Sequence, residues 1–317
     1  CRLHNIKFIG PSVEVMEKMA DKSKAKEEMI RAGVPVVPGS KGAVHSVTEG
    51  KKVALEIGYP IMAKAAAGGG GRGMRLIHDE SEFDQLFMAA SSEALAAFGD
   101  GTMYLERFIN NPRHIEVQVV GDSHGNAIHI GERDCSLQRR HQKVIEESPA
   151  ILLNDETRAK LHDVAVKATK YLKYEGAGTF EFLADDKQNI FFMEMNTRLQ
   201  VEHPVSEMVS GIDIVELMIK VAEGEKVPPQ ESIKFRGHAI ECRITAEDPN
   251  SFLPSPGKVT QWMVPGGRNV RVDSHVYAGY VVPPYYDSMI GKLIVWGRDR
   301  NKAINIMKRA LAEFEVE

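Results

Sequence analysis

Two carboxylates and an amide in the middle of the sequence are of the residue types that bind a divalent cation. Glu181 lies in "TFEFL", and Glu194 and Asn196 lie in "FFMEMN". On the strands of a hairpin, Glu194 and Asn196 share one face, about 7 Å apart along the chain, and Glu181 joins them from the neighbouring strand. These hard oxygens suit Mg²⁺, the ion that accompanies nucleotide phosphates. We predict a metal site, against the simpler interpretation that the acids face solvent on an amphipathic sheet.

Cationic residues and one more carboxylate flank this predicted hairpin. "LQRRHQKVIEESP" supplies Arg139, Arg140, His141 and Lys143, and "NTRLQVEHP" places Arg198, Gln200 and Glu202 on one face if it is extended. Beside a magnesium site, such a set suits a small anionic substrate and a general base. Each charge taken alone is also typical of a solvated surface.

A glycine-rich segment, "PIMAKAAAGGGGRGMRLIH", comes earlier in the chain. Its G-x-G-x-x-G pattern indicates a dinucleotide site only where a helix follows, but Met74 to His78 read as a strand. The Gly-Lys-Ser/Thr of a P-loop is absent. The pattern therefore predicts a hairpin whose tip folds over phosphates, with Lys64 on the incoming strand as a point charge. The alternative is a surface hairpin without a ligand.

Composition limits the class of protein. The chain has 317 residues, 43% hydrophobic and 26% charged, which is typical of a soluble globular protein of two or three domains. The net charge of −4 and the lack of a basic stripe argue against nucleic-acid binding. Cys1, Cys135 and Cys242 form no C-x-x-C, so a disulfide framework or zinc site is not expected, and a cytoplasmic location is. We expect no membrane span or signal peptide. Because the chain opens on Cys1 and stops at "FEVE", we expect a piece of a longer protein.

Periodicity predicts an α+β fold with largely antiparallel sheets. We expect helices over residues 12–32, 46–58, 79–99, 155–174, 211–224 and about 301–314. Strands are expected on both sides of the glycine loop, over 102–109, in half-buried hairpins over 114–136 and 178–196, and in "RGHAIECRITAEDP", "KVTQW" and "KLIVWG".

Seven phrases carry a family resemblance that covers essentially the whole chain. They are "KAAAGGGGRGM", "RRHQKVIEESPA", "GTFEFL", "MEMNTRLQVEHPVSE", "AIECRITAEDP", "FLPSPG" and "YAGYVVPPYYDSMIGKLI". In this order they resemble the biotin carboxylase component of biotin-dependent carboxylases, an ATP-grasp enzyme. "HQKVIEESPA" is most similar to the separate subunit of bacterial acetyl-CoA carboxylase, and related domains occur in pyruvate and propionyl-CoA carboxylases.

The resemblance implies a role for each matching position. ATP would be bound by Lys22, Lys64, Gly68, Gly69, Gly70, Gly71, Glu106, Arg107, Phe108, Ile109, His114, Gln138 and His141. Arg107 stands where many members have lysine, which keeps the charge and changes the hydrogen-bond geometry. Mg²⁺ or Mn²⁺ would be bound by Glu181, Glu194 and Asn196. Bicarbonate would be bound by Lys143, Arg198 and the backbone of Val201, with Glu202 as its base, and Arg243 would stabilise the biotin enolate.

The implied activity is ATP-dependent carboxylation of biotin on a carrier protein, through carboxyphosphate, as the first half-reaction of acetyl-CoA carboxylase in fatty acid synthesis. Implied partners are the biotin carboxyl carrier protein, carboxyltransferase subunits and, at full length, a second copy in a homodimer. Another ATP-grasp ligase, such as a carbamoyl-phosphate synthetase half, would share Lys64 and the metal set but not "RRHQKV" together with "ECRITAEDP". A catalytically silent nucleotide-binding module would be expected to lack a metal ligand or Glu202.

The resemblance also implies the domain organisation. Residues 1–36 would be a remnant of an N-terminal βαβ domain, whose "ANRGEIA" phrase is missing, with linker helices. Residues 37–110 would form the ATP-grasp lid, 111–230 the ATP-grasp core with the metal and bicarbonate site, and 231–317 a truncated biotin carboxylase C-terminal domain.

Overall fold

The computed structural model describes residues 1–65, 73–140 and 142–317, apart from the side chains of Arg2, Lys22 and Ser23. Within these residues the chain divides into two compact units. One unit comprises Pro35–Pro112, and the other comprises Cys1–Val34 with Arg113–Glu317. Each is described by itself.

The unit of residues 35–112 is a three-stranded antiparallel sheet covered by two helices. Its strand order is β2-β1-β3, and its elements are α3 (Val47–Ile57), β1 (Ile61–Ala65), β2 (Met74–Ile77), α4 (Glu80–Phe98) and β3 (Met103–Arg107). Ser46 and Asp79 cap the two helices at their N-termini, and Gly99 ends α4 in the left-handed conformation that glycine adopts without strain. β1 and β2 pair antiparallel, with Lys64 opposite Met74, so the predicted strands on both sides of the glycine loop are confirmed. The loop itself, residues 66–72, lies outside the described residues.

The N-terminal helix predicted over residues 12–32 is wrong, because the chain forms two helices there. These are α1 (Val13–Ala20) and α2 (Lys22–Arg31). Asp21 separates them in an extended conformation, and its carboxylate accepts a hydrogen bond from the backbone N–H of Lys24 at 3.1 Å. A short acidic side chain that satisfies the free N–H groups of a new helix is typical of an N-cap. The apolar period continues across Asp21, so the pattern alone conceals the break.

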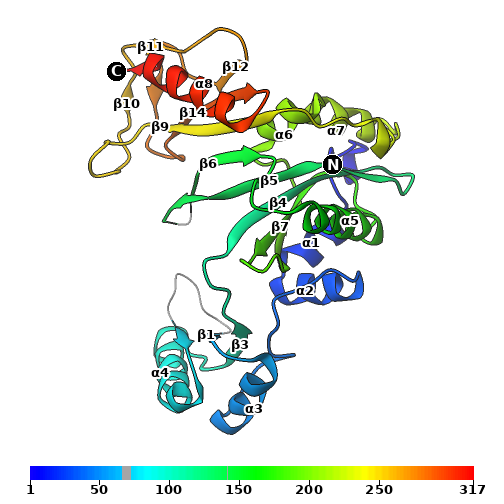
Figure 1. The fold of residues 1–317 in the computed structure, drawn as a ribbon, viewed down its shortest axis with the longest axis vertical. Helices are drawn as coiled ribbons and strands as arrows, with labels where there is room; N and C mark the ends of the chain where they lie inside the picture. The colour runs from blue at the N-terminus through cyan, green and yellow to red at the C-terminus, as the bar shows by residue number, and fades with distance from the viewer. Residues whose placement is uncertain (66–72, 141) are drawn as a thin grey trace. The chain divides into compact units, whose positions relative to one another are not determined.

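The larger unit is built on one eight-stranded antiparallel sheet in the order β12-β14-β9-β6-β5-β4-β7-β8 (Figure 1). The strands are β4 (Arg113–Gly121), β5 (Ala127–Arg139), β6 (Gln142–Ser148), β7 (Gly176–Ala184), β8 (Ile190–Asn196), β9 (His238–Thr245), β12 (Val270–Ser274) and β14 (Met289–Gly297). The two predicted hairpins, β4–β5 and β7–β8, are confirmed. The first hairpin is not half-buried as predicted. Glu116 and Gln118, on its polar face, are also completely buried, because buried partners from the rest of the sheet satisfy them.

Helices cover both faces of this sheet (Figure 1). α6 (His203–Ser210) and α7 (Ile214–Ala222) pack on one face, where Val205 and Val209 contact Ala239 and Ile294. α5 (Asp155–Tyr171) and α8 (Arg300–Glu313) pack on the other face. Helix α6 does not appear among the predicted elements, whereas α5, α7 and α8 confirm the predictions for those segments.

The C-terminal part carries two small strand pairs outside the large sheet. β10 (Gly257–Lys258) pairs with β13 (Val281–Val282), and β11 (Trp262–Met263) pairs with β15 (Glu315–Val316). The single strand predicted in "KVTQW" is therefore wrong: its two ends belong to different sheets. Short 3₁₀ turns occur at Arg2–His4 and Gln230–Ser232.

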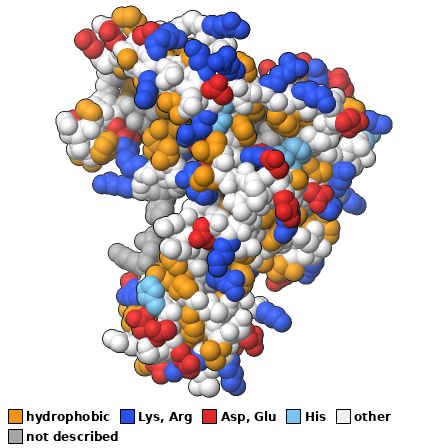
Figure 2. All heavy atoms as spheres, viewed as in Figure 1, with side chains coloured by type: hydrophobic (Ala, Val, Ile, Leu, Met, Phe, Trp, Pro, Cys, Tyr) orange, Lys and Arg blue, Asp and Glu red, His pale blue; other side chains and the backbone are white. Residues whose placement is uncertain are grey.

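Three observations concern the described residues generally. Cys1, Cys135 and Cys242 are free thiols. Over the described part of the chain, each helix is too short or too polar to cross a bilayer. Figure 2 shows acidic and basic side chains intermixed over the visible face rather than gathered by sign.

Candidate functional site

A pocket of about 720 Å³ opens on the face of the large sheet that carries α6. It lies within the larger unit, and its lining includes many residues that the sequence predicts for metal, substrate and nucleotide binding. These are His114, Gln138, Lys143, Glu181, Glu194, Asn196, Arg198, Val201, Glu202 and Arg243. They come from strands far apart in the sequence, which the sheet order β9-β6-β5-β4-β7-β8 places side by side.

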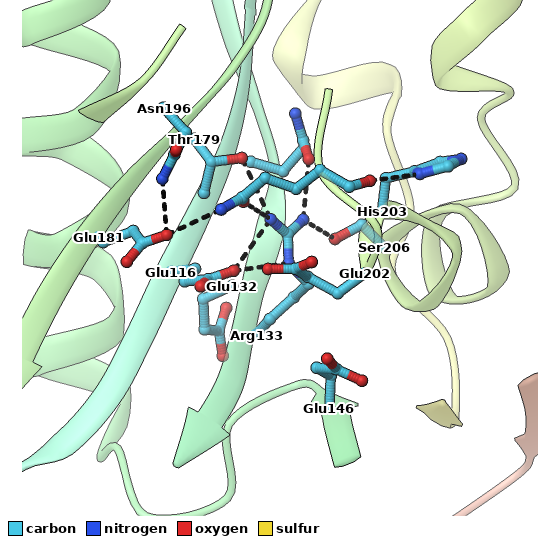
Figure 3. A network of polar contacts seen from close by, with 12 residues as sticks. Glu116, Glu132, Arg133, Glu146, Thr179, Glu181, Asn196, Glu202, His203 and Ser206 are labelled. Carbon is cyan, nitrogen blue, oxygen red and sulfur yellow. Dashed lines mark hydrogen bonds and ion pairs between the residues drawn. The ribbon is translucent and has the colours of Figure 1, made fainter. Parts of the chain in front are cut away.

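Arg133, on β5, lies at the centre of the network beneath the pocket (Figure 3). It is fully buried, and its guanidinium donates to Glu116 Oε2 at 3.2 Å. Further bonds go to Gln118, Thr179, Gln200 and Ser206, at 2.8–3.1 Å. A buried cation is tolerated when it is paired and its donors are satisfied, and Arg133 meets both conditions. It therefore joins β4, β7, the segment after β8, and α6 into one rigid floor.

Lys143, on β6, is the cation that faces several carboxylates at once. Its Nζ donates to Glu202 Oε1 at 2.7 Å and Glu181 Oε1 at 3.0 Å, and it also bonds Glu116. Burial alone would lower the pKa of Lys143, but the carboxylates of Glu116 and Glu202 outweigh it and hold the pKa above its ordinary range. Lys143 is therefore a permanent positive charge in the pocket.

Glu202 is held between two cations at the start of α6. Its Oε1 accepts from Lys143, and its Oε2 accepts from Arg243 Nη2 at 3.0 Å. Its side chain is almost completely buried although it borders the pocket. A carboxylate fixed at this rim, with cations on both sides, can accept a proton from an anion bound beside it.

The alternation of Arg198, Gln200 and Glu202 on one face required an extended segment, and the segment is not extended. The chain bends at Arg198 and turns at Val201 and Glu202 before α6 begins. Gln200 points inward, accepting from Arg133 and donating to Glu181 Oε1 at 2.7 Å. Lys292 Nζ donates to the carbonyl of Val201 at 2.9 Å and so fixes the turn. Arg198, Gln200 and Glu202 therefore line one pocket because the chain turns there, and not because they alternate along a strand.

The acidic hairpin provides the oxygen ligands that a divalent cation needs. Glu181 and Glu194 are register partners on β7 and β8, and Asn196 Nδ2 donates to Glu181 Oε1 at 2.7 Å. This leaves the carbonyl oxygen of Asn196 as a further ligand. Burial would raise the pKa of Glu181, but hydrogen bonding to His114 and the charge of Lys143 lower it to about 2, so this carboxylate is ionised. Two carboxylates and an amide oxygen at the pocket wall fit Mg²⁺.

His114, on β4, faces the same carboxylates. Its Nε2 lies 3.0 Å from Glu116 Oε1 and 2.9 Å from Glu181 Oε2, and Gln138 Nε2 lies 3.3 Å from its Nδ1. Burial would lower the pKa of His114, but the hydrogen bonds to Glu116 and Glu181 raise it to about 9. His114 therefore carries a positive charge at neutral pH.

Other predicted site residues belong to the unit of residues 35–112 or lie outside the described part. Lys64 Nζ bonds Glu106 Oε2 at 2.6 Å, and Arg107 donates to the carbonyl of Ile57, at the end of α3. Ile109 is nearly buried, and Phe108 is half-buried. Gly68, Gly69, Gly70, Gly71 and His141 lie outside the described residues, as does the side chain of Lys22.

The sequence analysis missed several charged residues under the pocket. They are Glu116, Arg133, Glu146, Glu241 and Lys292, and all lie on strands of the large sheet. A signal for two of them exists: Glu116 in "HIEVQVV" and Glu241 in "AIECRI" each stand between apolar residues. Alternation was interpreted as a solvated face, because a single sequence does not show which strands have both faces covered.

Two family models match the chain. The model described as "Carbamoyl-phosphate synthase L chain, ATP binding domain" matches residues 21–230, and "Biotin carboxylase C-terminal domain" matches residues 241–317. The first model bears the name of carbamoyl-phosphate synthase, so it does not separate that alternative from a biotin carboxylase. The second model is specific to biotin carboxylases and decides between the two families. The chain belongs to the biotin carboxylase family. Biotin carboxylases are ATP-grasp ligases, so the predicted fold and enzyme class are confirmed.

Known biotin carboxylases resemble the chain over its whole length. The biotin carboxylase of Nostoc sp. strain PCC 7120 is 57% identical over 318 residues, which cover 100% of this chain and 71% of the relative. A crystal structure of the Campylobacter jejuni biotin carboxylase in a β,γ-ATP complex is 66% identical, with a TM-score of 0.88, over 100% of this chain and 71% of that one. The bicarbonate-bound biotin carboxylase domain of a thermophilic 2-oxoglutarate carboxylase is 49% identical, with a TM-score of 0.95. This match covers 100% of this chain and 70% of that one.

Proposed function

We propose that this chain uses ATP and bicarbonate to carboxylate biotin on a carrier protein, and that its pocket binds the bicarbonate. The observation that supports this most directly is Glu202, held between Lys143 and Arg243 at the pocket rim. Lys143, Arg198 and the backbone of Val201 bind the anion, and Glu202 removes its proton. Arg243 then faces the biotin and stabilises negative charge that develops on its ring oxygen.

Glu181, Glu194 and Asn196 would hold Mg²⁺, or Mn²⁺ in its place. The ion, when bound, neutralises charge on the ATP phosphates during phosphoryl transfer. The chain's own contribution is to keep Glu181 ionised through Lys143 and His114. We also propose that His114, Gln138 and His141 contact the nucleotide. The nucleotide roles of Lys22, Lys64, Gly68, Gly69, Gly70, Gly71, Glu106, Arg107, Phe108 and Ile109 rest on the family resemblance.

We further propose that the carboxylase is an acetyl-CoA carboxylase in the cytoplasm, with a biotin carboxyl carrier protein, carboxyltransferase subunits and a second copy of the chain as partners. The support is the phrase "HQKVIEESPA". A carboxylase that acts on pyruvate, propionyl-CoA or a 2-oxo acid is the alternative. Supplying carboxybiotinylated carrier protein to carboxyltransferases of each class distinguishes these acceptors.

The substitution Glu202→Gln tests the role of the pocket, because it keeps the volume and removes the base. We expect bicarbonate-dependent ADP release in the presence of biotin to fall about 10²–10⁴-fold. Nucleotide affinity, measured by calorimetry, should stay within a few-fold of the parent because the residues proposed to bind ATP and the metal are unchanged.

The matched control is Glu216→Gln, which neutralises an exposed carboxylate on α7 that pairs with Lys220. It should release ADP at the parental rate. Near-parental ADP release by Glu202→Gln would show that Glu202 is not the base and would overturn the assignment of this pocket.

A further inference from the structure

Two buried carboxylates lie side by side behind the pocket. Glu146 on β6 and Glu241 on β9 are register partners, so they project from the same face of the sheet. Both are completely buried. Side chains that face each other across neighbouring strands have Cβ atoms about 4.5–5.5 Å apart. Two ionised carboxylates at this separation, away from water, repel each other strongly, so only one of them is expected to keep its charge.

The hydrogen bonds of the two carboxylates are unequal. Glu146 Oε1 accepts from Arg243 Nε at 2.7 Å. Glu146 Oε2 and both carboxylate oxygens of Glu241 are buried without a hydrogen-bond partner among the described residues. An ionised carboxylate with no donor in a buried site is far more costly than a neutral acid, which can itself donate. The unpaired oxygen of Glu146 is thus available as the acceptor for a proton on Glu241.

The surroundings of Glu241 are apolar on the side away from the pocket. Ala239 lies two residues before it on β9, and Ile294 lies opposite it on β14. Both belong to the cluster that packs against Val205 and Val209 of α6. Lys292 and Arg243 are cations that act on Glu241, but among the described residues none donates a hydrogen bond to its carboxylate.

We propose that Glu241 and Glu146 share one proton, and that this proton positions Arg243 in the pocket. Arg243 divides its donors between Glu146 behind it and Glu202 at the rim, where Nη2 bonds Oε2 at 3.0 Å. With one proton on the pair, a single negative charge lies behind Arg243. A second negative charge would draw the guanidinium back toward the sheet and weaken the positive potential that an anion in the pocket meets. Glu241 is therefore a positioning residue for Arg243.

The charges around the pair agree with a retained proton near neutral pH. Burial raises the pKa of Glu146 to about 7 although Arg243 opposes the change. Burial, followed by the carboxylate of Glu146, raises the pKa of Glu241 well above its ordinary value. The charged groups that act on the pair are Arg243 from β9, Lys292 from β14, Glu202 from the turn before α6, and Glu116 from β4. Helix α6 contributes Val205, Ser206 and Val209 to this side.

Infrared difference spectroscopy of the full chain tests the shared proton without any activity assay. At neutral pH the parent should show the carbonyl stretch of a protonated carboxyl group, and Glu241→Gln should lose it. Glu146→Gln should shift the band rather than abolish it, because Glu241 stays buried and only its neighbour changes. This variant serves if the first does not fold. The matched control is Glu147→Gln. Burial would raise the pKa of Glu147, but His238 and Arg300 lower it to about 2, so its loss should leave the band unchanged. A parent spectrum without the band, a band that survives Glu241→Gln, or a band that Glu146→Gln leaves at the same frequency overturns the proposal.

The positioning of Arg243 is tested by the pH dependence of bicarbonate use, and this part rests on the proposed function. The KM for bicarbonate in ADP release should rise on the order of tenfold in the parent once the pH is high enough to remove the retained proton. In Glu241→Gln, a neutral mimic of the protonated acid, it should stay nearly flat while the low-pH KM is parental. An unchanged pH profile in the variant contradicts the positioning role. A parent that releases no ADP overturns the proposed function, and the infrared measurement still decides whether the proton is shared.

Discussion

Arg133 is the residue on which the geometry of the pocket depends most. It contributes no atom to the pocket lining, yet it fixes Gln200, which precedes the turn that carries Val201 and Glu202. It also neutralises Glu116, which in turn accepts from Lys143. Arg133 therefore orients side chains that face the pocket, from a position outside the pocket lining.

Replacing Arg133 with Met should lower the free energy of unfolding by about 3–5 kcal/mol, because it leaves Glu116 buried with one cation fewer and several oxygens without donors. The loss is measured as the change in the free energy of unfolding in urea, with amide hydrogen exchange of β4 and β5 as the probe. Lys167→Met is the control, since Lys167 pairs with Asp163 at the exposed surface of α5, and it should change stability by less than about 1 kcal/mol. Equal effects of the two substitutions would show that the Arg133 network contributes little to stability.

The sequence analysis selected many of the side chains that line the pocket and missed the charges beneath them. Glu202 and Lys143 stand in segments rich in polar residues, so their types suggested chemistry directly. Glu241 alternates with apolar neighbours, and Arg133 stands between Glu132 and Asp134, and both patterns are typical of surface residues. Only the three-dimensional structure, in which helices cover both faces of the large sheet, shows that these residues are buried.

Among the elements, helix α5 is joined to the large sheet through Glu132 of β5. This carboxylate lies on the face opposite Arg133 and accepts from Arg158 Nε at 2.8 Å, and it lies 2.7 Å from His162 Nε2. His162 in turn stacks on His129, with ring centroids 3.9 Å apart. Burial would raise the pKa of Glu132, but the bonds from His162 and Arg158 lower it to about 2.

A carboxylate whose pKa is lower in the folded than in the unfolded state stabilises the fold above its unfolded pKa. Glu132 should thus contribute about 3 kcal/mol above pH ~4.5, and lose this contribution as the pH falls toward 2. Glu132→Gln should have a lower free energy of unfolding than the parent at neutral pH. This difference in free energy, the stability gap, should narrow as the pH falls from about 4.5 toward 2. Urea midpoints at a series of pH values measure the gap. Asp163→Asn, an exposed change on the same helix, should show a small gap throughout. A gap for Glu132→Gln that is constant with pH would contradict an ionic role.

Element boundaries were predicted well where caps and glycines mark them and poorly where tertiary contacts set them. Helix α4 begins after Asp79 and ends at Gly99, both of which the sequence displays. Helix α6 begins at Glu202 with no side-chain cap bond. Its start is fixed instead by the bond from Lys292 to Val201, ninety-one residues away in sequence. A local pattern contains no trace of such a contact.

At the scale of the whole molecule, the unit of residues 35–112 has a core of its own. Phe83 and Phe87 stack with ring centroids 5.3 Å apart inside a cluster that includes Ile61, Ile77 and Leu105. We propose that this unit unfolds independently of the large sheet, as an ATP-grasp lid would.

The substitution Phe83→Ala tests this independence in the full chain. Loss of a completely buried aromatic ring should destabilise its unit by about 3–5 kcal/mol. Hydrogen exchange should accelerate in α3, α4 and β1–β3 and stay parental in β4, β5 and β7. Phe180→Ala, in the core of the large sheet, should give the reverse pattern. Faster exchange throughout the chain in either variant would show that the two units unfold together.

The pairing of β6 with β9 covers an edge of the large sheet. Ile145 to Ser148 bond to residues 239–242, so a segment from the C-terminal third completes a sheet begun in the middle of the chain. Without that segment, β6 would present a row of free N–H and C=O groups, and the apolar side of α6 would lose Ala239 and Ile294. Such an edge is a template for another copy of the same strand. Residues 238–297 therefore protect the β6 edge from pairing with the same strand of another copy, and a fragment ending at residue 230 should precipitate however intact its pocket residues are.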